Sequence, residues 1–349
     1  MPADIINRKD NQRLFAQYWQ EFVAHNKLGP EYLLTNIDYL LAYSDKLVTD
    51  RSFILAKNNQ PVAVVFLPIE KDEQYKSMTI AQSFVPAPVF LAQKDLEANI
   101  MHSIDQIAST ENVAKIMLRI DPLEHQQYPY NFLINYDYLD ASLLGYLLDC
   151  QQPEMRRNHR RAVKKIQDDP DFSIFIMDQK NSDYQIHETY RAFHHKCAGK
   201  ITRPKATFDW QFKMLEQGNA VLVGLKYKDQ FIAFTYFTYQ ADKAVSFSAA
   251  DDPAFDHLPL YHIINAQALA YLKNHGVKEM DMGQPLTISD QFFYHPDAKQ
   301  KNISLFKTGF GGRFVQNFYG VKYFSQQLFE ADLADFVKKY KIADYEQKK

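Results

Sequence analysis

Two pairs of short apolar runs stand out in the pattern of hydrophobic and polar positions. Residues 53–57 and 62–67 are mainly apolar and flank a short polar turn. A second polar turn, 170 residues later, separates the apolar runs 220–225 and 231–237. Runs of this length that are rich in branched and aromatic side chains and joined by polar turns predict β-hairpins.

A helix-like segment and then an extended segment follow each hairpin. The first half has apolar positions at helical spacing over 96–109 and an extended run at 115–121. The second half has the same two segments at 260–274 and 277–282, at an offset of about 163 residues. The repeated order predicts a duplicated α/β (α+β) fold, in which each copy has a mixed, mainly antiparallel sheet flanked by helices. Chance repetition of a common arrangement is the alternative.

The predicted boundary between the copies lies near residue 150. A chain of 349 residues is long for one hydrophobic core and sufficient for two. We therefore expect an N-terminal subdomain over residues 1–150 and a C-terminal subdomain over residues 151–349. The second subdomain begins with a basic linker helix and ends with an amphipathic helix at 327–341.

The linker helix concentrates positive charge. Pro153 suits the first turn of a helix, and residues 154–165 carry six Lys or Arg against one Glu. The cations form two neighbouring rows at i, i+4 spacing, namely Arg156, Arg160 and Lys164, and Arg157, Arg161 and Lys165. Like charges in such rows repel, so the pattern points to a phosphate-bearing ligand or a nucleic acid. A solvated helix face, or pairing with acidic residues elsewhere, is the other interpretation.

Composition narrows the class of protein. Apolar residues make up 46% and charged residues 23%, which excludes a disordered chain, a collagen-like repeat and a disulfide-rich mini-protein. A net charge of −2 provides no general attraction for nucleic acid or membrane. The two cysteines, Cys150 and Cys197, are typical of a protein in a reducing compartment. The first residues lack the apolar core of a signal peptide, and the longest apolar stretch is too short to cross a bilayer. We expect a cytoplasmic protein without a transmembrane segment.

Glycine is scarce and unevenly distributed. The chain has 11 glycines, where an average usage of roughly 7% predicts about 24. Six of them lie at or after residue 276: Gly276, Gly283, Gly309, Gly311, Gly312 and Gly320. We expect glycine at these positions because the backbone there has little choice of residue.

Familiar catalytic motifs are absent from the sequence. It has no Gly-x-Ser-x-Gly elbow, no phosphate-binding loop, no dinucleotide-binding Gly-x-Gly-x-x-Gly and no His-Glu-x-x-His. Acidic and imidazole side chains do cluster at Asp251, Asp252, Asp256, His257 and His262. Because Asp-Asp-Pro before a helix is explained by turn and N-cap chemistry, we expect no metal there.

Several motifs of the second half, in order, resemble the Fem-type aminoacyltransferases and related acyltransferases with a duplicated GNAT-like fold. They cover residues 154–320, and the F-K-x-G-F-G-G motif is the most specific. The motifs are the basic stretch 156–165, the hairpin 222–239, Ser-Ala-Ala-Asp at 248–251, G-x-x-x-x-D-x-G at 276–283 and Phe-Lys-Thr-Gly-Phe-Gly-Gly at 306–312.

The first half is less similar to this family. Residues 84–89 resemble the P-R-G-P-V loop of its cell-wall members, but Pro86 replaces the Arg and Ala87 replaces the Gly. This departure puts a peptidoglycan precursor in doubt as the acceptor. The chain resembles most the polysaccharide-associated acyltransferases of the wider family, which implies an amine on a sugar, nucleotide sugar or peptide precursor as acceptor.

The resemblance implies an N-acyltransferase and a set of site residues. Lys307 would stabilise the oxyanion that forms when an amine attacks a carbonyl, and Asp281 would position the amine or act as general base. Their alternative roles are a surface lysine and a strand-end turn carboxylate. The predicted substrate-binding residues are Phe306, Gly309, Gly311, Gly312, Arg156, Arg157, Arg160, Arg161, Lys164, Tyr236, Asp251 and Tyr261. Tyr239 and Tyr294 are further pocket candidates, although with 22 tyrosines in the chain any of them could be core or rim.

The donor stays open between acyl-CoA and aminoacyl-tRNA, and we expect no tightly bound cofactor. Residues 250–262 contain no glycine, which weakens an ordinary acetyl-CoA site. The chain also lacks the inserted helical hairpin of many tRNA-dependent members, so tRNA is possible but not favoured. Two alternative functions remain on the same fold: a non-catalytic protein that binds an anionic glycan or nucleotide, and a tRNA-dependent aminoacyltransferase.

Overall fold

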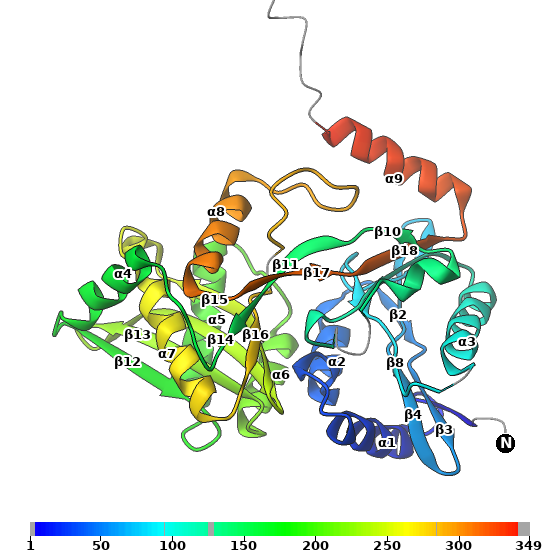
Figure 1. Ribbon diagram of the computed structural model, residues 1–349, viewed down its shortest axis with the longest axis horizontal. Helices are drawn as coiled ribbons and strands as arrows, with labels where there is room; N and C mark the ends of the chain where they lie inside the picture. Colours follow the sequence, from blue (N-terminus) through cyan, green and yellow to red (C-terminus); the bar gives the residue numbers. More distant parts are fainter. Residues whose placement is uncertain (1–3, 94, 125–128, 284, 341–349) are drawn as a thin grey trace, which may run out of the picture.

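Three β-sheets form the framework of the protein. The computed structural model describes residues 4–93, 95–124, 129–283 and 285–340 (Figure 1). The first sheet has the order β1 (Asp4–Asn7), β3 (Phe53–Lys57), β4 (Gln60–Val65), β8 (Val89–Phe90). The second has the order β10 (Leu139–Asp140), β18 (Tyr319–Tyr323), β9 (Val113–Arg119), β6 (Tyr75–Met78), β5 (Pro68–Asp72), β2 (Leu47–Asp50), and β7 (Val85–Pro86) also pairs with β9. The third has the order β12 (Phe172–Met177), β13 (Ala220–Tyr227), β14 (Gln230–Gln240), β15 (Lys243–Asp251), β16 (Glu279–Asp281), β11 (Leu143–Asp149), β17 (Arg313–Asn317).

Helices cover these sheets. In the first half they are α1 (Gln12–His25), α2 (Leu34–Tyr43) and α3 (Leu96–Glu111). In the second half they are α4 (Arg157–Gln167), α5 (Tyr184–Ala198), α6 (Lys205–Glu216), α7 (Leu260–Asn274), α8 (Ala298–Lys307) and α9 (Gln326–Lys339). Side chains of α4 and α7 build one core of the third sheet, and side chains of α5 and α6 build the core on its other face. None of the helices in the described part of the chain is long and apolar enough to span a membrane.

The predicted fold class is confirmed, including both hairpins. The β3–β4 turn has φ of 52° and 59° at Asn58 and Asn59, and the β13–β14 turn has φ of 48° and 62° at Lys228 and Asp229. Two consecutive residues in the left-handed region are typical of the type I′ turns that close two-residue hairpins. Each half therefore contains a hairpin of the same local geometry.

The two halves also share a parallel strand pair in the same place. In the first half β6 runs parallel to β9, and in the second half β15 runs parallel to β16. Each partner strand follows a helix, α3 in the first half and α7 in the second. The structure thus carries the same helix-to-parallel-strand step twice.

The halves exchange strands at their junction. β11 precedes residue 150 but lies in the third sheet between β16 and β17, whereas β18 near the C-terminus pairs with β9 of the first half. Figure 1 shows these strands crossing between the two lobes. The division at residue 150 therefore stays a prediction about the repeated units, and the sheets themselves interlock across it.

Candidate functional site

A cavity of about 650 Å³ opens where β15 and β16 part. The two strands pair at only three positions, from Lys243 opposite Glu279 to Val245 opposite Asp281. Beyond that point β15 runs on to Asp251, and the space beside it is lined by Ser246, Phe247, Asp281 and Gly283. Gly283 has φ of 68°, and a Cβ there would lie 2.8 Å from the carbonyl oxygen of Ser246, so glycine is required for this approach.

The first half and the segment from β17 into β18 supply the opposite wall of this cavity. Glu31 and Arg119 form an ion pair there, and Tyr319 stacks on Phe84 with ring centroids 4.6 Å apart. Burial raises the pKa of Tyr319 to about 12, so its hydroxyl stays protonated at neutral pH. Asn317 is 94% buried on the cavity wall, and its Oδ1 has no hydrogen-bond partner among the described residues. The Asn317 amide lies against Gly145, where a Cβ would collide with it.

Asp281 places an ionisable carboxyl on the cavity wall. Only 8% of the residue is exposed, and burial raises the pKa of its carboxyl above the ordinary value of 3.8. The backbone N–H of Gly283, which donates to its Oδ1 at 2.8 Å, and the charges of Arg119 and Lys307 act in the opposite direction. A carboxylate held in this way is a stronger base than an exposed one.

Lys307, the last residue of α8, comes close to Asp281. Its ammonium donates to the carbonyl oxygen of Met282, and burial lowers its pKa to about 8, against the attraction of the Asp281 carboxylate. Lys307 is not among the described residues that line the cavity. The two predicted catalytic residues are therefore neighbours, with Asp281 on the cavity wall and Lys307 next to it.

The sequence of α8 and its cap explains why Lys307 lies beside Asp281. Asp297 and Gln300 form a capping box at the start of the helix, with side-chain to backbone distances of 2.7 and 2.8 Å. Ser304 then donates to the carbonyl oxygen of Pro285 at 2.8 Å. These bonds fix the helix on the segment that follows β16, and its last residue arrives beside Asp281.

The rest of the F-K-x-G-F-G-G motif packs against the protein itself. Phe306 stacks on His159 with centroids 5.3 Å apart, and the Gly309 carbonyl accepts from the N–H of Arg156 at 2.8 Å. A Cβ at Gly309 would lie 2.0 Å from the His159 ring. Neither residue lines the cavity at Asp281. Their contacts hold the start of α4 against the end of α8.

The last two glycines of the motif have the same kind of surroundings. Gly311 has φ of 83°, and a Cβ there would lie 2.6 Å from the backbone nitrogen of Glu154. Gly312 has φ of 130°, and a Cβ there would lie 2.3 Å from the Leu147 carbonyl oxygen. The sequence predicted that the backbone at these glycines approaches a substrate closely. In the structure it approaches other backbone atoms of the protein, and neither glycine lines the cavity at Asp281.

The basic face of α4 is exposed and lies outside the cavity. Arg156, Arg157, Arg160, Arg161 and Lys164 are all exposed, and none of them forms an ion pair within the described part of the chain. Arg160 instead donates to the Met155 carbonyl. Among the described residues, no acidic side chain therefore neutralises these cations, as one interpretation of the sequence had proposed. An external anion would relieve their mutual repulsion.

The remaining predicted residues fall into two other places. Asp251 and Tyr261 lie together, with the Tyr261 hydroxyl donating to Asp251 at 2.7 Å. Asp251 is six residues beyond Val245 on the same strand, which is about 20 Å at roughly 3.3 Å per residue. Tyr236 is fully buried in the core against α5 and α6 and donates to the Gln211 carbonyl. Among the other tyrosine candidates, Tyr294 lines the cavity.

The cavity residues that were not singled out from the sequence include Glu31, Arg119, Asn317 and Tyr319. Arg119 carried a signal, because it is a lone arginine at the end of an apolar run that reads as a buried strand. The others come from segments with no local feature of a site. They reach the cavity only through pairings between distant parts of the chain, such as β18 with β9.

Comparisons with known proteins agree with the observed fold. Residues 153–293 match the family described as acetyltransferase (GNAT) domain. The crystal structure of FemX superimposes with a TM-score of 0.62 at 12% identity, covering 94% of this chain and 99% of that one. The lysylphosphatidylglycerol synthase L-PGS from Bacillus licheniformis gives 0.60 at 12% identity, covering 93% and 97%.

A third solved structure repeats the two-lobed arrangement. A tandem GNAT protein from the clavulanic acid biosynthesis pathway gives a TM-score of 0.50 at 10% identity, covering 92% of this chain and 98% of that one. No curated protein sequence matches the chain. At these identities the structures show the fold, and the family match locates the acetyltransferase domain in the second half. Residues 153–293 therefore match a GNAT acetyltransferase domain, and the chain as a whole shares the fold of FemX, L-PGS and a tandem GNAT protein.

Proposed function

We propose that the cavity at Asp281 is the acyl-transfer site, and that an amine on a sugar, nucleotide sugar or peptide precursor becomes an amide there. The observation that carries this proposal is the buried Asp281 carboxyl on the wall of a cavity lined by both halves, beside the charge of Lys307. Among these acceptors we favour an amine-bearing sugar. We expect the enzyme to act in the cytoplasm, in polysaccharide or cell-envelope biosynthesis.

Asp281 serves as the base in this proposal. The acceptor nitrogen attacks the donor carbonyl, a C–N bond forms, and the bond from that carbon to the donor's oxygen or sulfur breaks. The proton lost from nitrogen passes to the Asp281 carboxylate, and the leaving group takes up a proton as it departs. The raised pKa of Asp281 favours the first transfer, because a more basic carboxylate binds the proton more strongly.

Lys307 supplies positive charge next to this reaction. Its ammonium stabilises the ionised form of Asp281 before the reaction, and we propose that it also stabilises the oxyanion that develops on the carbonyl oxygen. Since its pKa is about 8, most molecules carry this charge at neutral pH, and the fraction falls in mildly alkaline solution.

The cations of α4 fit the phosphate groups of the donor. An acyl-CoA and an aminoacyl-tRNA both carry several phosphates, and the exposed face of α4 offers arginines without a carboxylate partner among the described residues. The segment between β15 and α7 contains no glycine, so we do not expect it to wrap a pyrophosphate as a glycine-rich loop would.

The proposal can be tested with a panel of donors and acceptors. Thermal-shift measurements with acyl-CoAs, tRNA and nucleotide sugars would identify ligands, which would then be incubated in pairs and analysed by mass spectrometry for an amide product. We expect an amide with wild type and about 10²–10⁴-fold slower formation of it with Asp281→Asn. RNA binding that weakens steeply with salt, together with activity lost on RNase treatment, would favour the tRNA-dependent alternative. Stabilising ligands without a product from any pair would favour a binding protein.

A further inference from the structure

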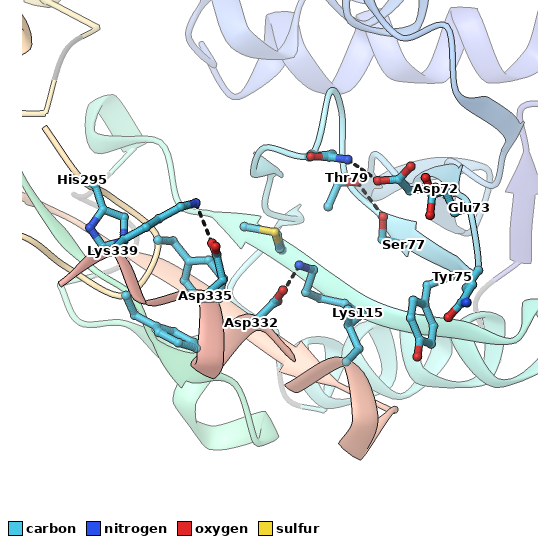
Figure 2. Close-up of a pocket in the computed structure, with 16 residues that line it drawn as sticks. Asp72, Glu73, Tyr75, Ser77, Thr79, Lys115, His295, Asp332, Asp335 and Lys339 are labelled. Carbon is cyan, nitrogen blue, oxygen red and sulfur yellow. Dashed lines mark hydrogen bonds and ion pairs between the residues drawn. The ribbon is translucent and has the colours of Figure 1, made fainter. Parts of the chain in front are cut away.

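A second cleft of about 460 Å³ lies beneath α9, the last helix described (Figure 2). Its floor is the face of β6 and β9 that carries Ser77, Lys115 and Met117. One wall is α9, which contributes Asp332 and Asp335, and the opposite wall is the turn between β5 and β6. Figure 2 shows side chains from these two walls facing each other across β9.

This cleft adjoins the cavity at Asp281. Gln82, Met117 and Phe293 line both spaces. Lys115, Met117 and Arg119 alternate along β9 and therefore share one face of the strand, with Lys115 in the cleft and Arg119 in the cavity. The four steps from Lys115 to Arg119 cover about 13 Å at roughly 3.3 Å per residue. The two spaces thus lie end to end over one strand.

The charge of the cleft disfavours phosphate. Its described lining has four carboxylates, namely Asp72, Glu73, Asp332 and Asp335, against the two lysines Lys115 and Lys339. Lys115 is bound to Asp332 at 2.8 Å, Lys339 is bound to Asp335, and Asp72 is bound at 2.8 Å to Lys46, which does not line the cleft. Glu73 is the lining carboxylate without an ion pair among the described residues, and it leaves the cleft with net negative charge. A phosphate would meet net negative charge here, whereas a protonated amine would be attracted. Nucleotides and RNA therefore fit the face of α4 and not this cleft.

The floor of the cleft also disfavours an extended peptide. A bound strand needs a free sheet edge for main-chain hydrogen bonds. Here β6 lies between β5 and β9, and β9 lies between β6 and β18, so neither floor strand has a free edge. Recognition must come from side chains, and those present combine aromatic rings with hydroxyl and carboxylate groups: Tyr75, Phe292, Phe293, Ser77 and Asp335. Rings of this kind suit the apolar face of a sugar, and the oxygens suit its hydroxyl edge.

We propose that the cleft beneath α9 is a subsite for the second sugar of an amine-bearing oligosaccharide, whose first sugar presents its amine to Asp281. The inference rests on the proposed acyl transfer to a sugar amine and extends it from one sugar to at least two. The end-to-end placement of the two spaces over β9 gives the acceptor a continuous path. The net acidic lining selects sugars that carry free amines over sugars that carry phosphate.

Two charge reversals on α9 test the subsite. Asp335→Lys changes a lining residue, whereas Glu330→Lys makes the same change on an exposed residue of the same helix that does not line the cleft. The probes are glucosamine and its β-1,4-linked dimer, with binding measured by calorimetry in the absence of donor. We expect wild type to bind the dimer about tenfold more tightly than the monomer, Glu330→Lys to keep this ratio, and Asp335→Lys to bring it close to one.

The outcomes separate the subsite from the reaction. Equal affinity for monomer and dimer in wild type, or the same loss in both variants, would overturn the subsite. Acyl transfer to glucosamine with no preference for the dimer in kcat/KM would also overturn it while leaving the proposed reaction intact. Dimer binding that Asp335→Lys weakens, without acyl transfer from any donor, would support the subsite and contradict the reaction.

Discussion

Asp281→Asn is the sharpest perturbation of the proposed reaction. The substitution keeps the size of the side chain. In the wild type the N–H of Gly283 donates to the Asp281 carboxylate at 2.8 Å, and the Asn oxygen can accept the same hydrogen bond. It removes the negative charge and with it the ability to take up a proton. Because Asp281 is buried on the cavity wall and its pKa is raised, we assign it the whole contribution of general-base catalysis, which is about 10²–10⁴-fold. The barrier should rise by about 3–5 kcal/mol, at 1.36 kcal/mol per tenfold.

The assay is kcat/KM for amide formation, followed by mass spectrometry over a range of pH. Wild-type activity should fall as acid protonates Asp281, with the midpoint above the usual range of an aspartate because burial raises the pKa. Glu216→Gln, an exposed residue at the end of α6, is the matched control and should leave activity unchanged. A loss of less than about threefold in Asp281→Asn, with an unchanged midpoint of thermal unfolding, would refute its role as base.

Three further changes address the lysine, the basic helix and the glycine motif. Since burial lowers the pKa of Lys307 to about 8, kcat/KM should decline above that pH. Lys307→Arg should move the decline to higher pH because a guanidinium stays charged. The measurement is a pH profile of kcat/KM for both proteins. Replacing Arg157 and Arg161 with Gln should weaken donor binding and flatten its dependence on salt, measured by titration at several KCl concentrations. Gly312→Ala should lower the free energy of unfolding by more than about 2 kcal/mol. Gly276 has φ of 80° but open space around it, so Gly276→Ala should lower the free energy of unfolding by about 1 kcal/mol. Denaturant titration measures both values.

Local periodicity predicted much of the fold. The apolar pattern placed a helix at 260–274, and α7 has those bounds. It also placed the hairpin at 220–237, which is β13 and β14. These elements were accessible because each depends on side chains close in sequence, where the spacing of apolar positions reports the buried face. The pairing of β18 with β9, across 200 residues of chain, leaves no such local pattern.

The same distinction separates the site residues. Asp281 and Lys307 were found through short motifs, and the structure brings them together, although their catalytic roles stay predictions. The glycines of the second motif were also found, but the spacing alone could not tell whether their close neighbour is a ligand or the chain. Gly312 answers this, because the atom nearest its missing Cβ is the Leu147 carbonyl oxygen. A glycine in a motif indicates that another atom lies close to that position, but the structure is needed to identify that atom.

The exchange of strands explains why the cavity belongs to both halves. β11 and β17 carry the edge of the second-half sheet, and the chain leaves β17 directly into β18 of the first-half sheet. Asn317 at the end of β17 and Tyr319 at the start of β18 both line the cavity, so the crossover itself supplies two of its polar groups. Glu31 and Arg119 complete that wall from the first half. A ligand that binds these groups and Asp281 together therefore holds the two sheets in register, and its binding free energy adds to the stability of the junction.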